Sequence, residues 1–200
     1  MKALPKKLLP LTLFAIVVTS LFSVQPAQAY TVTLKEVGSN VVATGHGAIN
    51  LTGLTFEGSS FVGPSIGAAE GIIATGQANN LDGYSGFTGP PSFGSGIFSA
   101  PNASSGDIVG ITNVIGEIAV PLGYLSGAPL SDSMTFNNAT LASLGVDTPG
   151  TYVWTWGTGL PNQNFTLIIG RAGVPDGGST VSLLGFALLG LGALRRKLGC

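Results

Sequence analysis

Hydrophobic and polar residues alternate in short runs through the middle of the chain. Many runs contain β-branched or aromatic residues and are separated by Gly, Pro or Asn, a pattern that predicts β-strands joined by turns. We expect strands at residues 30–34, 47–54, 60–62, 71–75, 107–112, 117–120, 133–136, 151–156 and 164–169. Short strands at this spacing, with no amphipathic helix between them, predict an all-β fold, an antiparallel β-sandwich or jelly roll.

The two strands expected at 151–156 and 164–169 flank a loop with Gly, Pro and Asn, so we expect them to form an antiparallel hairpin. Within the first of these strands, alternation would place its aromatic residues on one face. The helix-like segment of this region is residues 139–144, ended by Gly145. The segment 83–96 predicts a long loop, either a cover over a sheet edge or the rim of a binding site.

The start of the chain breaks this pattern. Three lysines within the first seven residues precede an almost unbroken apolar run over residues 8–24, and Ala27 and Ala29 supply the small-x-small spacing that signal peptidase recognises. We therefore expect residues 1–29 to be a secretory signal peptide with a helical apolar segment. Cleavage by signal peptidase would leave Tyr30 as the first residue of the mature chain.

The end of the chain combines a polar turn at 174–180, an apolar stretch at 181–194 and a basic cluster of Arg195, Arg196 and Lys197. The stretch 180–194 carries no charge but is shorter than the roughly 20 residues that span a bilayer. The basic cluster is expected to stay on the cytoplasmic side, so the domain before it would lie across the inner membrane. An ordinary tail anchor is the alternative reading of this segment.

The motif Val174, Pro175, Asp176, Gly177 and Gly178, followed by the apolar helix and the basic end, resembles the C-terminal sorting signal of exosortase substrates. This is the PEP-CTERM class in its VPDSG variant, with Gly177 where that variant has Ser. The resemblance implies that an exosortase removes the tail of a protein transiently anchored in the inner membrane of a Gram-negative bacterium. The product would reach the cell surface or the medium.

The chain then divides into a signal peptide at 1–29, an ectodomain at 30–173 and a sorting signal at 174–200. In the ectodomain only Lys35 and Arg171 oppose eight acidic residues, which disfavours phosphate backbones and anionic lipids, so nucleic acid is excluded as a partner. The chain has one His and one Cys, few side chains for proton transfer or for transition metals. We expect no enzyme activity, no cofactor and no metal.

Three motifs bear on these expectations. Ser65 lies in a G-x-S-x-G sequence typical of a nucleophile elbow, with His46 as its base, but a chain so rich in Gly and Ser produces such a match by chance. The segment 79–83 has the chemistry of a calcium loop or of an Asx turn. The eight acidic residues do not exclude a carboxylate pair for glycoside hydrolysis, but no spacing in the sequence marks such a pair, because the distance between its members is set by the fold.

The aromatic residues Tyr84, Trp154 and Trp156 can stack on sugar rings, although the tryptophans also fit the core of the hairpin. The sequence therefore predicts an exported, non-enzymatic surface or matrix protein that associates with exopolysaccharide or the cell envelope. The alternative is a lectin-like, glycan-binding β-sandwich. A hydrolase with its site on the 83–96 rim is a third hypothesis.

Overall fold

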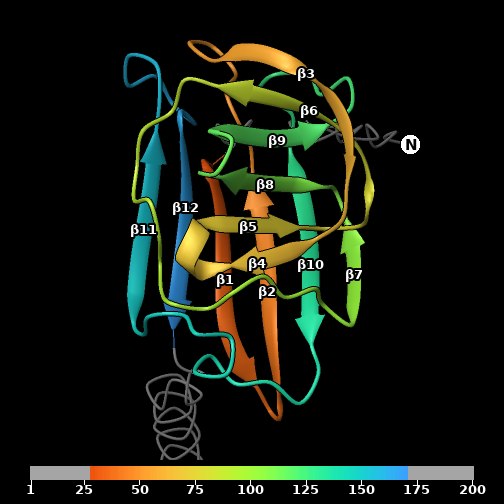
Figure 1. Ribbon diagram of the computed structural model, residues 1–200. Helices are drawn as coiled ribbons and strands as arrows, with labels where there is room; N and C mark the ends of the chain where they lie inside the picture. Colours follow the sequence, from red (N-terminus) through yellow and green to blue (C-terminus); the bar gives the residue numbers. More distant parts are fainter. Residues whose placement is uncertain (1–27, 171–200) are drawn as a thin grey trace, which may run out of the picture.

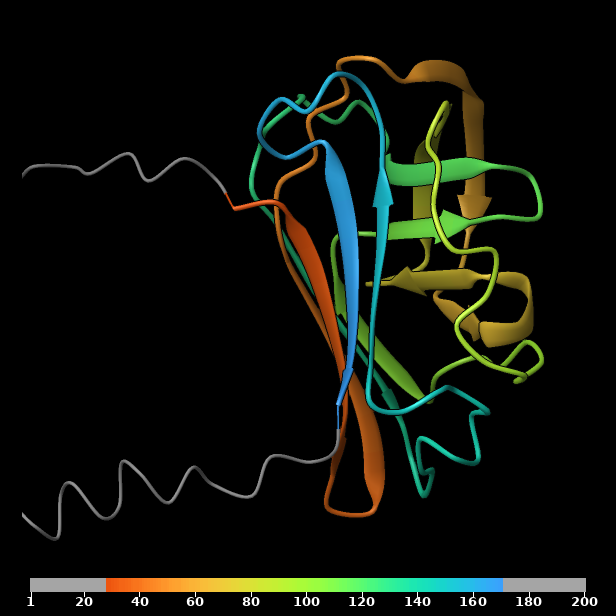
Figure 2. The same ribbon diagram turned by 90° about the vertical axis from the view of Figure 1, so that its left-hand side faces the viewer.

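The computed structural model describes residues 28–170, which form two six-stranded β-sheets packed face to face (Figures 1 and 2). The all-β sandwich expected from the sequence is confirmed. Ala27 and both apolar terminal segments lie outside the described residues, as does the C-terminal motif with its basic cluster. Within 28–170, no helix has the length and apolar character needed to cross a membrane.

The first sheet contains both ends of the described chain. Its strand order is β11-β12-β1-β2-β10-β7, and all neighbours are antiparallel except β1 and β12, which run parallel. The strands are β1 (Tyr30–Val37), β2 (Asn40–Gly47), β7 (Ala103–Gly106), β10 (Leu130–Phe136), β11 (Gly150–Thr155) and β12 (Asn164–Gly170).

The second sheet is antiparallel throughout, in the order β3-β6-β9-β8-β5-β4. Its strands are β3 (Thr55–Val62), β4 (Ser65–Gly67), β5 (Ile72–Thr75), β6 (Asn79–Ser85), β8 (Val109–Thr112) and β9 (Glu117–Pro121), and the short 3-10 helix η1 (Ala68–Glu70) joins β4 to β5. Its strands run crosswise to those of the first sheet in Figure 1, as in orthogonal sheet packing.

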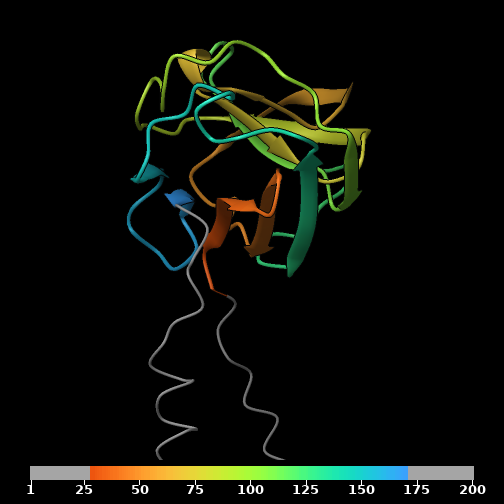
Figure 3. The ribbon, with the colours of Figure 1, turned by 90° about the horizontal axis from the view of Figure 1, so that it is seen from below.

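Strand alternation creates the core between the two sheets. Figure 3 shows these two layers from below. In β1, the side chains of Tyr30, Val32 and Leu34 are fully buried, whereas the intervening threonines are half-buried on the opposite face. Equivalent inward positions of β5, β8 and β9 supply isoleucines and valines from the second sheet. Each such large apolar side chain contributes about 1.5–3 kcal/mol when buried.

The hairpin prediction is confirmed, because β11 and β12 pair antiparallel. Two other local predictions are wrong. The strand expected at 47–54 is mostly an irregular segment, and the strand in this part of the chain is β2, which ends at Gly47. Residues 139–144 form hydrogen-bonded turns in place of a helix.

Of the loop expected at 83–96, residues 83–85 are the end of strand β6. The rest, 86–96, covers the open edge of β11, which confirms the cover interpretation. Thr88 and Thr155 exchange two backbone hydrogen bonds of 2.9 and 2.8 Å, and the indole nitrogen of Trp154 donates to the carbonyl oxygen of Pro90 at 3.0 Å. Phe93, farther along this segment, is buried in the core. The covered edge therefore does not offer a free strand for pairing.

Candidate functional site

The three aromatic residues proposed for sugar stacking occupy different environments. Trp154 is fully buried and Trp156 is 5% exposed, which confirms the core interpretation for both. The indole nitrogen of Trp156 donates to the carbonyl oxygen of Asn50 at 2.7 Å. Trp154 packs edge-on against Phe93 and Phe165. Neither indole therefore presents a free face to a sugar ring.

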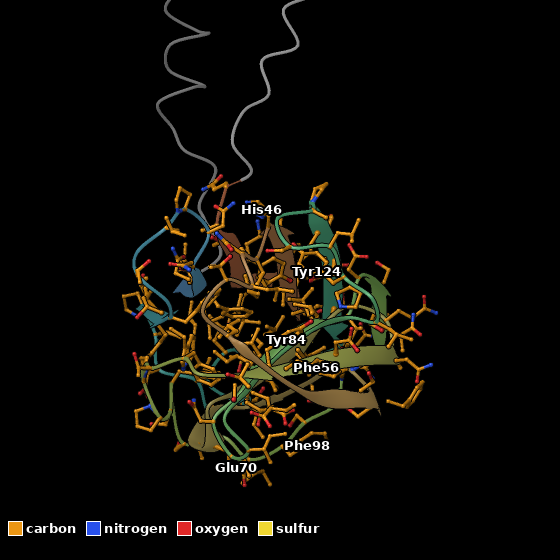
Figure 4. All side chains as sticks on the ribbon, turned by 90° about the horizontal axis from the view of Figure 1, so that it is seen from above. His46, Phe56, Glu70, Tyr84, Phe98 and Tyr124 are labelled. Atoms are coloured by element: carbon orange, nitrogen blue, oxygen red, sulfur yellow. The ribbon has the colours of Figure 1, made fainter. Side chains whose placement is uncertain are left out.

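Tyr84 lies nearer to the surface than the tryptophans. It is half-buried in β6 and contacts Phe56 of the neighbouring edge strand β3, with 5.5 Å between ring centroids (Figure 4). Phe56 is 54% exposed. This aromatic pair was missed by the sequence analysis, because Phe56 lies outside the strand expected at 60–62.

Trp156 borders a cleft of about 460 Å³ at the ends of β11 and β12. Its wall also contains Thr88, Thr155, Gln163 and Asn164. The Gln163 side chain is committed to the protein: its amide nitrogen donates to Thr52 O at 2.6 Å and its oxygen accepts from backbone nitrogens of the adjoining loop. The cleft is therefore a small, polar and internally braced recess.

The structure does not bring Ser65 and His46 together as a nucleophile and its base. Ser65 is a buried residue of β4, in the second sheet, where it pairs with Ala74. His46 is an exposed residue of β2, in the first sheet. The sequence following Ser65 continues into a three-residue 3-10 helix, so the strand-to-helix turn of a nucleophile elbow is not formed.

The segment 79–83 is a regular part of strand β6, neither a calcium loop nor an Asx turn. The carboxylate of Asp82 is held by two protein donors: the Ser59 hydroxyl at 2.6 Å and the Gly123 backbone nitrogen at 2.8 Å. Across residues 28–170 there is no group of three or more His, Cys, Asp and Glu side chains placed to hold a metal ion.

A buried polar cluster between the sheets was also missed. The Tyr30 hydroxyl donates to Oδ2 of Asp132 and lies 3.1 Å from the Thr75 hydroxyl, which in turn donates to Val109 O at 3.2 Å. Gly45 leaves room for the pair, because a Cβ there would overlap the Tyr30 hydroxyl. The alternation within β10 is the sequence signal that could have revealed this cluster. Asp132 is two positions from the inward-facing Met134 and therefore points to the same side of the sheet.

Burial has the largest effect on the pKa values of Asp132 and Tyr30 in this cluster. It raises the pKa of Asp132 to about 6, while the hydrogen bond from Tyr30 and the nearby Thr75 hydroxyl oppose the rise and the nearby Asp107 carboxylate adds to it. Burial also raises the pKa of Tyr30 well above its usual range, with the Asp132 carboxylate acting in the same direction. The Tyr30 hydroxyl therefore stays protonated and serves as a donor within the fold.

Comparison with known proteins adds information on the C-terminal end of the chain. Residues 173–198 match the model of the VPDSG-CTERM motif. No curated protein and no solved structure matches the chain significantly. The motif supports an exported protein that an exosortase processes and that associates with the cell surface. The segment 173–198 is thus a VPDSG-CTERM motif, a PEP-CTERM-like variant of the exosortase sorting signal.

Proposed function

We propose that this is a non-enzymatic matrix or surface protein of a Gram-negative bacterium. It crosses the inner membrane, is held there transiently by its C-terminal segment and is released when an exosortase cuts near Val174, Pro175, Asp176, Gly177 and Gly178. The released domain associates with exopolysaccharide or the cell envelope. The sorting motif at residues 173–198 is the observation that carries this proposal.

The organisation of the folded domain supports a binding or structural role. Two of its carboxylates help to hold the fold together: Asp82 ties β3 to the β9–β10 loop, and Asp132 accepts from Tyr30 between the sheets. The Ser65 and His46 pair considered for hydrolysis is divided between two sheets. These arrangements fit a stable extracellular scaffold better than a hydrolase.

A lectin-like, glycan-binding module remains the second candidate, and the pair of Tyr84 and Phe56 favours it. Phe56 exposes half of its side chain beside the Tyr84 ring. Exposed aromatic rings can stack on the apolar faces of sugars. This candidate differs from the first in requiring recognition of a defined glycan by an aromatic site.

The mass of the native protein from the producing cells tests the sorting proposal. We expect the mature chain to begin at Tyr30 and to end within residues 174–177, as determined from the intact mass and from the two terminal peptides. Double replacement Pro175→Ala and Asp176→Ala should block processing, because it removes the rigid turn and the carboxylate from the recognised motif. The variant would then retain Cys200.

The controls separate processing from export. Cells without their exosortase should produce the full tail on the otherwise unchanged protein, whereas Asp147→Asn, an exposed change within the domain, should leave both termini as in the parent. A native chain that still ends at Cys200 in cells with an active exosortase would show an ordinary tail anchor and overturn the proposal.

A further inference from the structure

The outward face of the first sheet carries a row of side chains, most of which bear a hydroxyl group. The strand registers align one outward residue from each of the six strands, and each of these residues is exposed or half-buried. In order across the sheet they are Thr151, Ile168, Thr33, Thr44, Ser133 and Ser105. Five of these six side chains carry a hydroxyl group. Thr33, Thr44, Ser133 and Ser105 follow one another at one strand separation of about 4.8 Å, and the exposed Ile168 separates Thr151 from them.

The neighbouring row begins with the exposed Val153 of β11, which pairs with Thr166, and continues with mostly hydroxyl side chains. Thr166, Thr31, His46 and Ser131 align across β12, β1, β2 and β10. At the β11–β12 corner, Thr155 and Asn164 extend the face to the 460 Å³ cleft described above. We call these two rows and this corner the hydroxyl face.

Charge is distributed unevenly around the domain. Lys35, the one Lys or Arg side chain in residues 28–170, borders the hydroxyl face, because it lies two positions along β1 from Thr33 and therefore on the same side of the sheet. Of the eight carboxylates in this part of the chain, only Asp107 borders the face, where it accepts a hydrogen bond from the Ser131 backbone nitrogen. Glu36 bonds instead to the Leu141 backbone nitrogen.

The remaining carboxylates lie away from this surface. Asp132 is buried between the sheets, and Glu57, Glu70, Asp82 and Glu117 belong to the second sheet and its connections. Asp147 lies in the β10–β11 connection of the first sheet, beside Tyr152. The hydroxyl face is therefore the side on which this acidic domain repels an anionic polymer least. The electrostatic potential around a protein influences which charged partners approach it and at which surface they bind.

Short side chains also make the face suited to binding. Ordering a long side chain such as Lys, Glu or Arg on binding costs conformational entropy. Threonine is stiff at χ1 and loses little freedom when covered. Each hydroxyl both donates and accepts hydrogen bonds, so the rows can match a polymer whose own hydroxyls repeat along its length.

We propose that the hydroxyl face is the polysaccharide-binding surface of this protein, contacting a neutral or carboxylated glycan chain through its threonine and serine rows. This deepens the proposed association with exopolysaccharide and rests on it. Lys35 supplies the one cationic contact for a uronate carboxylate. The γ-methyl groups of the threonines pack against the C–H groups of the sugar rings.

A pair of matched charge variants tests this surface. The processed protein is passed over three immobilised probes: exopolysaccharide isolated from the producing cells, uncharged dextran and polygalacturonate. Thr33→Glu with Ser133→Glu places two carboxylates in the row and removes two hydroxyl groups, and binding is expected to fall about tenfold or more, which corresponds to about 1.4 kcal/mol. Ser60→Glu with Thr112→Glu makes the same charge change on the outer face of the second sheet and should leave binding unchanged.

Two further variants define the contacts. Thr44→Val keeps the shape of the side chain but removes the hydroxyl, and should weaken binding to whichever probe the parent retains. Lys35→Gln should weaken polygalacturonate binding more than dextran binding. Circular dichroism and the unfolding midpoint of each variant show whether the fold is kept.

Several results would overturn the inference. Equal losses in the two charge pairs would indicate general repulsion, and unaltered binding in Thr33→Glu with Ser133→Glu would place the glycan elsewhere. Loss only in Phe56→Ala would assign the glycan to the Phe56 and Tyr84 pair. Absence of binding by the parent to all three probes would remove the hydroxyl face as a glycan site. The exosortase proposal would still stand if the intact mass shows a processed chain.

Discussion

Replacing Trp154 by alanine is expected to lower the free energy of unfolding by about 3–5 kcal/mol, the range for deleting a buried aromatic ring. The ring is fully buried and packs edge-on against Phe93 and Phe165, with centroids 6.4 and 5.8 Å away. The change also removes the indole donor to the Pro90 carbonyl oxygen, one of the contacts that hold the 86–96 cover on β11. Urea titration of the processed protein, followed by the fluorescence of Trp156, measures this loss.

A neighbouring position supplies the control. Val153 is on the same strand but 40% exposed, so Val153→Ala should change the free energy of unfolding by less than about 0.5 kcal/mol. Trp154→Phe should fall between the two, because it keeps an aromatic ring but not the hydrogen bond to Pro90. An alanine variant as stable as the parent would mean that Trp154 does not anchor the core.

The sequence predicted correctly those strands in which the alternation of apolar and polar residues runs through the whole strand. In β11 and β12, alternation is unbroken and both strands pack a face of large apolar residues. The segment 47–54 misled the prediction because its apolar residues are buried or half-buried, although beyond the single bridge of Ala48 to Ala29 they form no strand pairing. Ala48 donates to Gln28 O, and the Ile49 nitrogen donates to the Tyr124 hydroxyl. In a single sequence, apolar residues that are buried by contacts with distant segments cannot be distinguished from the apolar residues of a strand.

Two other differences have local physical causes. Strand β6 begins with two asparagines and contains Asp82 and a glycine, residues with low strand propensity, and pairing with β3 and β9 on either side stabilises it. The expected helix at 139–144 is too short to offset its nucleation cost. Thr140 and Ser143 also bond to each other's backbone nitrogens through their hydroxyls, which favours a turn.

The candidate surfaces were only partly accessible to sequence reasoning. The C-terminal motif is a linear signal, so its residues identify it directly. The hydroxyl face depends on the order β11-β12-β1-β2-β10-β7, which joins segments more than 100 residues apart and places Thr33 beside both Ile168 and Thr44. No spacing along the chain contains that information.

Stability is expected to fall as the pH rises through the titration of Asp132. Its folded-state pKa of about 6 lies above the ordinary value of 3.8, so the folded protein binds the proton more tightly than the unfolded chain. The resulting stabilisation is fully present below about pH 4 and is lost as the pH rises through about 6, a difference of about 3 kcal/mol. Urea unfolding of the processed protein between these limits and pH 8 measures it.

Asp132→Asn isolates this contribution, because the amide oxygen still accepts from Tyr30 and the residue no longer ionises. The difference between parent and variant should change by about 3 kcal/mol between pH 4 and pH 8 in favour of the variant, whereas Asp147→Asn, at an exposed position, removes one carboxylate outside the core. Tyr30→Phe removes the hydrogen bond that favours the carboxylate, so it should move the loss to higher pH. If the stability difference between the parent and Asp132→Asn is independent of pH, the core does not hold Asp132 in its neutral form.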